Sequence, residues 1–155
     1  MRNATLITLL VLTAATTVAQ NTWIGGAPGH ETDWMDARNW TRQRVPEWND
    51  NVLIPHLWHH NYPKVSTNVP AIAHLEVEGG AQLNITSEGH LLIDGRNTHN
   101  SGVLLIGNIV NEGSLAINST ALEAIDGKRH NLANRNNGQF TTNGHLVAYE
   151  FGAGH

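Results

Sequence analysis

The fold of this chain is decided by four glycine-headed runs between residues 80 and 117, namely Gly80-Ala81-Gln82-Leu83-Asn84-Ile85, Gly89-His90-Leu91-Leu92-Ile93, Gly102-Val103-Leu104-Leu105-Ile106 and Gly113-Ser114-Leu115-Ala116-Ile117. Each run holds a Leu and an Ile two positions apart, and alternate residues of a strand point to the same face. A helix would need apolar residues three and four apart, and it tolerates glycine poorly. The pattern therefore predicts an all-β fold, with weaker copies of the run at Gly138 and Gly144.

The spacing of the runs narrows the architecture. Their first glycines lie 9, 13 and 11 residues apart, which leaves room only for turns between strands. Similarity between the runs is typical of the stacked rungs of a β-solenoid, whereas the spacing alone also fits a β-sandwich. We therefore expect a β-solenoid and keep a β-sandwich as the alternative. In a solenoid the runs would form one core stack made of Leu83, Ile85, Leu91, Ile93, Leu104, Ile106, Leu115 and Ile117.

The composition excludes several classes of protein. Only 14% of the 155 residues are charged while 40% are hydrophobic, so the chain is not a disordered polyelectrolyte. Nine Lys and Arg with a net charge of −4 argue against a nucleic-acid partner. The absence of Cys removes disulfides, thiolate zinc sites and cysteine nucleophiles. Fifteen Gly and eighteen Asn indicate many turns, as an all-β chain requires.

The first 19 residues are predicted to be a signal peptide. Met1-Arg2 supplies the positive start, Leu6 to Ala15 the apolar segment, and Thr17-Val18-Ala19 the small-x-small cleavage pattern before Gln20. No second apolar stretch of this kind follows, so we expect no transmembrane segment in the mature chain and a secreted, extracellular or cell-surface location. The predicted divisions are a signal peptide over 1–19, an N-terminal cap and leading segment over 20–64, solenoid rungs over 65–151 and a C-terminal tail over 152–155.

A tryptophan-rich segment precedes the runs. Its motifs are Thr22-Trp23-Ile24-Gly25-Gly26, Asp33-Trp34-Met35-Asp36-Ala37-Arg38-Asn39-Trp40, Val45-Pro46 and Asn49-Asp50-Asn51-Val52-Leu53-Ile54-Pro55. This series resembles the leading segment of secreted surface proteins of Bacteroidetes-type bacteria. The stretch from Pro46 to Gly95 is also similar to the eight-glycine extracellular domain of animal cell-surface proteins. The resemblance implies a right-handed parallel β-helix in an extracellular adhesin or surface-layer component.

The same segment has a physical role as a cap. An open solenoid end exposes an apolar core and unpaired strand edges, which must be covered. Trp23, Trp34 and Trp40 have the bulk to cover it. Turn and capping hydrogen bonds are expected from the polar residues between them, Asp33, Asp36 and Asn39. Asp50 is predicted to form the turn that leads into the strand Val52-Leu53-Ile54.

The candidate ligand site lies in the segment from Pro55 to Pro63. Trp58 and Tyr62, with His59 and His60 beside them, offer aromatic faces on which sugar rings can stack. The competing interpretation is that Trp58 packs back on the cap. His56, His59 and His60 lack a neighbouring acid and the HExxH spacing, so we expect an exposed loop rather than a metal site.

No catalytic pattern stands out. The chain has no G-x-S-x-G and no phosphate-binding glycine loop, and Glu76 and Glu78 alternate with apolar residues as a solvated strand face does. We therefore expect no enzyme activity and no cofactor. The function predicted is a secreted structural or adhesive surface module that self-associates into a filament or layer, or that binds a cell-surface or glycan partner. The alternatives are a carbohydrate-binding module and a fragment of a polysaccharide-active β-helix enzyme.

Overall fold

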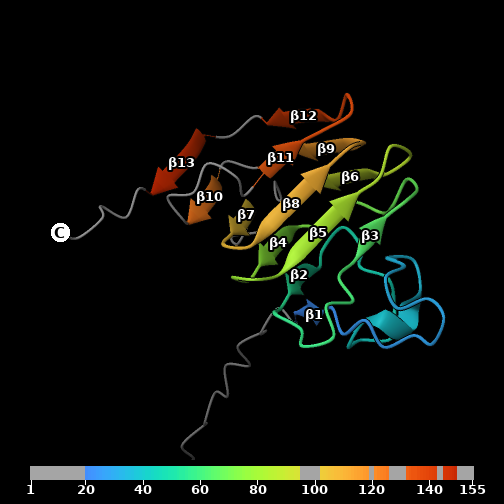
Figure 1. The fold of residues 1–155 in the computed structure, drawn as a ribbon. Helices are drawn as coiled ribbons and strands as arrows, with labels where there is room; N and C mark the ends of the chain where they lie inside the picture. Colours follow the sequence, from blue (N-terminus) through green and yellow to red (C-terminus); the bar gives the residue numbers. More distant parts are fainter. Residues whose placement is uncertain (1–19, 95–101, 119–120, 126–131, 143–144, 150–155) are drawn as a thin grey trace, which may run out of the picture.

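A computed structural model describes residues 20–94, 102–118, 121–125, 132–142 and 145–149 of the chain (Figure 1). The described part is all-β, with one short 3-10 helix, η1, at Ala37–Asn39. No helix in these residues is long and apolar enough to cross a membrane. The predicted signal peptide over 1–19 and the predicted tail over 152–155 lie outside the described residues.

The described strands form three parallel sheets. The first has the order β1-β2-β4-β7-β10-β13, with strands at Asn21–Thr22, Asn51–Ile54, His74–Val77, Gly102–Leu105, Ala121–Ile125 and His145–Tyr149. The second has the order β11-β8-β5-β3, with strands at Leu132–Asn134, Asn108–Asn111, Gln82–Ile85 and Lys64–Val65. The third has the order β12-β9-β6, with strands at Gln139–Thr142, Ser114–Ile117 and His90–Ile93. Parallel ladders do not fit the antiparallel sheets of an immunoglobulin-type β-sandwich.

The chain visits the three sheets in turn. Strands β4, β5 and β6 are followed by β7, β8 and β9, and then by β10, β11 and β12. Partners in register are therefore far apart in sequence: Leu91 pairs with Leu115, 24 residues further on. The glycine-headed runs lie on β5, β6, β7 and β9, which belong to three different sheets. Only β6 and β9 of these four strands are neighbours in one sheet, so the 9-, 13- and 11-residue spacings of the runs do not measure the distance between paired strands.

Glycine is required at the turns between the sheets. A Cβ on Gly113 would collide with the backbone carbonyl oxygens of Thr86 and Gly89. A Cβ on Gly89 would collide with the carbonyl oxygen of Val65. At these two positions the chain passes directly over backbone from an earlier part of the sequence, and only a residue without a side chain fits there.

The core lies inside the three sheets and is built from alternate residues of each strand. Six of the eight predicted stack residues are at most 2% exposed: Leu83, Ile85, Leu91, Ile93, Leu115 and Ile117. The prediction is wrong for Leu104, which is only half-buried, and for Ile106, which is 36% exposed. Strand β7 pairs with β4 so that Val103 and Leu105 continue the inward column of Leu75 and Val77. The four residues from Val103 to Ile106 are all apolar. The alternation of side chains along a strand therefore does not show which two of them face inward.

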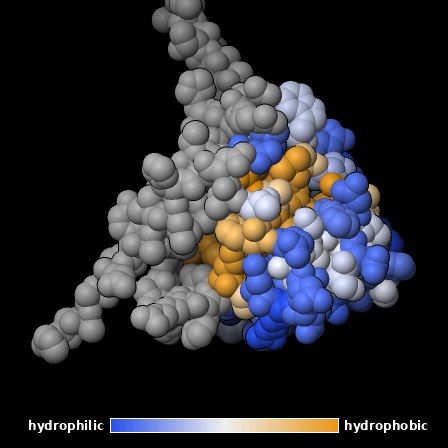
Figure 2. All heavy atoms as spheres, turned by 90° about the horizontal axis from the view of Figure 1, so that it is seen from above, coloured by the Kyte–Doolittle hydropathy of each residue, from blue (hydrophilic) through white to orange (hydrophobic). Residues whose placement is uncertain are grey.

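The two ends of the sheets differ. Trp23, Trp34 and Trp40 are fully buried beside β1 and β3, and their rings pack edge to face with centroids 4.9 and 4.7 Å apart. At the other end, Leu132 and Phe140 pair with Ile109 and Leu115 but are only partly buried. Figure 2, seen from above Figure 1, shows apolar residues at the surface beside hydrophilic ones.

The predicted turn bonds around the tryptophans are confirmed. Asp33 Oδ1 accepts a hydrogen bond from the Met35 amide at 2.9 Å, and Asp36 Oδ1 accepts one from the Arg38 amide at 3.0 Å. The Asn39 side chain is fully buried; it accepts from the Ala27 amide at 2.8 Å and donates to two backbone carbonyls. These bonds give the segment a fixed shape in place of regular structure.

Asp50 does more than make the predicted turn. Its side chain is 2% exposed and accepts two hydrogen bonds of 2.6 Å from Arg44, one of 3.2 Å from Arg42 and one of 2.8 Å from the Glu47 amide. The bond to Asp50 raises the pKa of the Arg44 guanidinium. The Asp50 carbonyl also accepts from the Ala73 amide at 3.1 Å, so this residue joins the leading segment to the turn before β4.

Candidate functional site

Residues 55–63, the Trp58 loop, connect β2 to β3. Several hydrogen bonds attach the loop to the rest of the molecule, among them one from the Asn84 amide to the Pro63 carbonyl at 3.0 Å. The His56 amide donates to Glu78 Oε2 at 3.0 Å, the Tyr62 hydroxyl donates to the Gly80 carbonyl at 2.9 Å, and Trp23 Nε1 donates to the Asn61 carbonyl at 2.7 Å. The loop is therefore fixed at both ends to the cap and to the β4–β5 turn.

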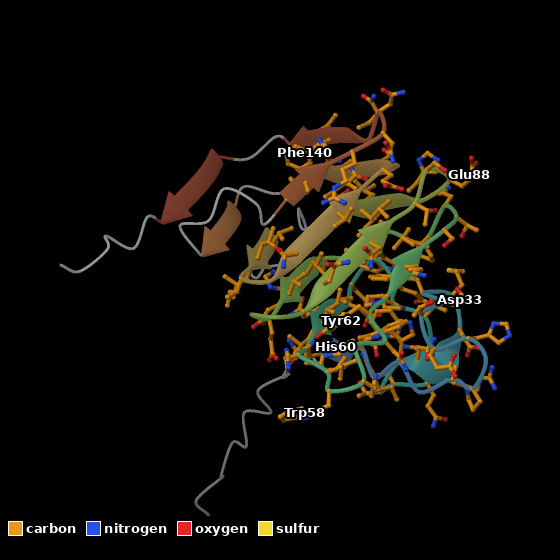
Figure 3. The ribbon with its side chains drawn as sticks, in the orientation of Figure 1. Asp33, Trp58, His60, Tyr62, Glu88 and Phe140 are labelled. Atoms are coloured by element: carbon orange, nitrogen blue, oxygen red, sulfur yellow. The ribbon has the colours of Figure 1, made fainter. Side chains whose placement is uncertain are left out.

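Trp58 lies at the tip of this loop and is 91% exposed (Figure 3). Its closest aromatic neighbour is His56, with ring centroids 6.1 Å apart and planes at 78°. The interpretation that Trp58 packs back on the cap is wrong. Both faces of an indole presented in this way are open to a flat apolar ligand such as the ring of a sugar.

Tyr62 lies at the base of the loop and is only 9% exposed. Its hydroxyl is used within the protein, because it donates to Gly80 and accepts from the Leu57 amide at 3.3 Å. The structure therefore places Tyr62 beneath the loop as an anchor and does not expose its ring beside Trp58. Sequence reasoning could not separate these two roles, since both need an aromatic residue in the same loop.

The three histidines of the loop are exposed and do not converge. The His60 ring lies 6.2 Å from the His56 ring and 6.0 Å from the Tyr62 ring, while His59 Nδ1 accepts a hydrogen bond from the Asn61 amide at 3.2 Å. Among the described residues, no three His, Asp or Glu side chains are grouped closely enough to hold a metal ion. The loop can therefore offer Trp58, His56 and His60 as surface groups for binding.

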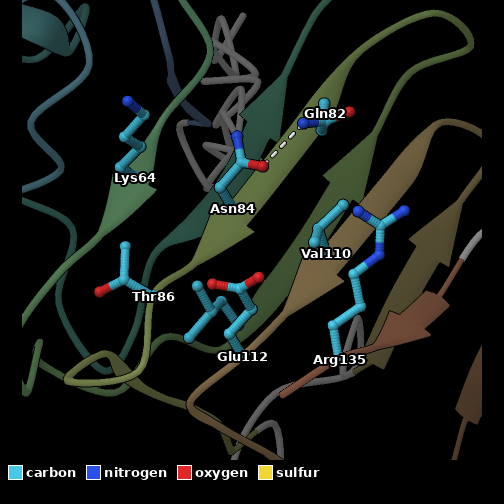
Figure 4. A pocket seen from close by; sticks show the side chains of 8 residues that line it. Lys64, Gln82, Asn84, Thr86, Val110, Glu112 and Arg135 are labelled. Carbon is cyan, nitrogen blue, oxygen red and sulfur yellow. Dashed lines mark hydrogen bonds between the residues drawn. The ribbon is translucent and has the colours of Figure 1, made fainter. Parts of the chain in front are cut away.

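A second candidate site, which the sequence did not reveal, is a groove on the outer face of the β11-β8-β5-β3 sheet. The groove has a volume of about 400 Å³ (Figure 4). Its lining residues come from every strand of that sheet or from the turns that follow: Lys64, Gln82, Asn84, Ile85, Thr86, Val110, Glu112 and Arg135. Register brings them together, because Lys64 pairs with Asn84 and Asn84 pairs with Val110. No sequence motif spans residues so far apart. Locating the groove requires knowing that strands of this sheet pair through residues 20 to 26 positions apart in the sequence.

Several polar groups of the groove are already hydrogen-bonded within the protein, including the Thr86 hydroxyl, which donates to the Val65 carbonyl at 3.3 Å. Gln82 Nε2 donates to Asn84 Oδ1 at 2.7 Å, and Asn136 Nδ2 donates to Glu112 Oε1 at 2.9 Å. Neither Lys64 nor Arg135 forms an ion pair with a residue of the described ranges. Glu112 is the one carboxylate in the lining, whereas glycoside hydrolysis ordinarily uses a pair of carboxylates. The groove thus has the groups for binding and lacks the carboxylate pair of a glycosidase.

A family model described as a domain of unknown function, DUF8693, matches residues 22–143. The chain belongs to this family. The DUF8693 match begins at the first strand and continues through β12, so it includes the tryptophan cluster, the Trp58 loop and the groove. It also crosses the predicted boundary between residues 64 and 65. No curated protein and no solved structure matches the chain.

Proposed function

We propose that this DUF8693 chain is a secreted, non-enzymatic structural or adhesive module of a cell surface, built as a right-handed parallel β-helix. The observation that supports the solenoid is the order in which the chain enters its sheets, with each sheet receiving one strand per turn. The hand follows from general topology, because crossovers between parallel strands of one sheet are almost always right-handed. The predicted signal peptide supports export.

Self-association through the β11–β12 end is the specific form of this proposal. The opposite end is covered by three buried tryptophans, whereas β11 and β12 are the outermost strands of their sheets within the described residues. Leu132 and Phe140 lie half-buried on that end. An outer strand presents unpaired backbone groups, and exposed apolar side chains beside it favour pairing with another chain.

The test is the mass of the purified chain by light scattering over a wide concentration range. We expect the mass to rise with concentration. Phe140→Lys, which places a charge at the β12 end, should abolish the rise, whereas Ile24→Lys should leave it unchanged because Ile24 is an exposed apolar residue, at 40%, of the capped end. Circular dichroism establishes that both variants are folded. A monomeric mass at every concentration would exclude this form of the proposal.

Carbohydrate binding through the Trp58 loop is a second candidate, supported by the 91% exposure of Trp58 on a loop that hydrogen bonds to the cap, the β4–β5 turn and β5 hold in place. A glycan array of the purified chain tests it. Trp58→Ala should remove binding without changing stability, and Trp48→Ala is the matched control because Trp48 is also exposed, at 62%, but lies outside the loop. An array without a hit, or equal binding by both variants, would count against this site.

A further inference from the structure

We propose that the groove on the β11-β8-β5-β3 sheet binds an anionic polysaccharide, through Lys64 at one end and Arg135 at the other. The proposal is independent of self-association and of the Trp58 loop, because it rests on different residues. It names an acidic glycan, carboxylated or sulfated, as the adhesive partner.

The lining of the groove differs in charge from the protein as a whole. The chain as a whole has a net charge of −4, yet the groove is lined by two cations and one carboxylate. Glu112 is engaged by the Asn136 amide at 2.9 Å, whereas Lys64 and Arg135 have no ion pair within the described ranges. The lining itself holds one more cation than carboxylate in a protein of negative net charge, which favours an anionic ligand at this place.

Lys64 and Arg135 lie far apart across the sheet. Lys64 is on β3, Asn84 on β5 and Val110 on β8, and Arg135 directly follows β11. Adjacent strands lie about 4.8 Å apart, so the two cations are separated by three strand steps, or roughly 14 Å across the sheet. A single small anion cannot reach both positions. A polymer that carries repeated negative charges can lie across the strands and contact both.

The floor of the groove is formed mainly by polar side chains. The outward residues of β5 and its following turn, Gln82, Asn84 and Thr86, present two amides and a hydroxyl. Figure 4 shows Asn84, Val110 and Glu112 between the two cations. Amides and hydroxyls placed on a rigid sheet match the hydroxyl groups of a sugar, and the Val110 methyl groups can contact a sugar ring. The Arg135 guanidinium can bind a carboxylate or a sulfate through two parallel hydrogen bonds.

The experiment measures binding of the purified chain to three immobilised polymers: polygalacturonate, dextran sulfate and uncharged dextran. It is performed at pH 8, where a histidine with an ordinary pKa of about 6.5 is neutral. We expect binding to at least one of the two anionic polymers, little binding to dextran, and weaker binding as salt is added. Binding to polygalacturonate alone would assign a carboxylated ligand, and binding to dextran sulfate alone would assign a sulfated one.

The variants test whether the groove is responsible. Lys64→Gln and Arg135→Gln should each weaken binding about tenfold, the usual effect of losing one charge-assisted hydrogen bond. Arg38→Gln is the matched control, since it removes the same charge from the cap and should bind as the unmodified chain does. Failure to bind either polyanion, an equal loss in Arg38→Gln, or equally tight binding of a thymidine oligonucleotide would overturn the proposal.

Discussion

Leu105→Ala is expected to destabilise the fold far more than Leu104→Ala. The two positions are adjacent and the chemical change is identical, but Leu105 is 3% exposed and pairs with the inward Val77, whereas Leu104 is half-buried and pairs with the outward Glu76. Removing three buried carbons at about 0.8 kcal/mol each, with a further cost for the cavity, gives about 3 kcal/mol for Leu105. Partial burial reduces the loss at Leu104 to about 1 kcal/mol.

The assay is urea unfolding followed by tryptophan fluorescence, because Trp23, Trp34 and Trp40 are fully buried and report loss of the fold. The free energy of unfolding is compared for the unmodified chain and the two variants. The slope of that free energy against urea concentration should be the same for all three, so that the comparison reports stability alone. Equal destabilisation by both variants, or a larger effect at Leu104, would refute the register assigned to β7.

Three further predictions concern the cap and the turns. Asp50→Asn should lower the free energy of unfolding by about 2–3 kcal/mol, because Arg42 and Arg44 lose their shared buried carboxylate. Asp33→Asn at the surface is the control. An equal loss of stability in both variants would contradict the role given to the Asp50 carboxylate. Hydrogen bonds from the Arg38 side chain and then its amide lower the pKa of the Asp36 carboxyl from 3.8 to about 2. Since the folded-state pKa is the lower one, the stabilisation from Asp36 is present above about pH 4 and is lost as the pH falls through 2; an NMR titration with a midpoint near 3.8 would be inconsistent with this bond. Gly113→Ala should destabilise by about 2 kcal/mol or more through its collision with the Thr86 and Gly89 carbonyls, whereas Gly26→Ala, where no such crowding exists, should be nearly neutral in the same unfolding assay.

The sequence predicted the local features of the fold well because they depend on neighbouring residues. Alternation identified strands and gave the correct inward face where one residue of each pair was polar, as in Leu83-Asn84-Ile85. The capping roles of Asp33, Asp36 and Asn39 also follow from short-range chemistry. The face of β7 was not predictable in this way, since Val103 to Ile106 are all apolar and only pairing with β4 selects the inward residues.

Features that depend on strands far apart in the sequence were missed. Gly89 and Gly113 head their runs because both face backbone carbonyl oxygens, and similarity of that kind does not show which strands are neighbours. The groove needs the pairing of Lys64 with Asn84 and of Asn84 with Val110, which no local pattern encodes. Within the Trp58 loop, the exposed and buried aromatic residues were distinguishable only once the Tyr62 hydroxyl was seen bound to Gly80.

Strands of this fold return to the same sheet after the chain has visited the other two, and thiol cross-linking tests this most directly because the chain has no native Cys. Asn84→Cys combined with Val110→Cys places two outward thiols on paired residues of β5 and β8, about 4.8 Å apart between strands. Asn84→Cys combined with Leu92→Cys places them on consecutive glycine-headed runs that belong to different sheets. We expect a short thiol-bridging reagent to cross-link the first pair and not the second, as read by mass spectrometry. Efficient bridging of the second pair without the first would contradict the three-sheet arrangement.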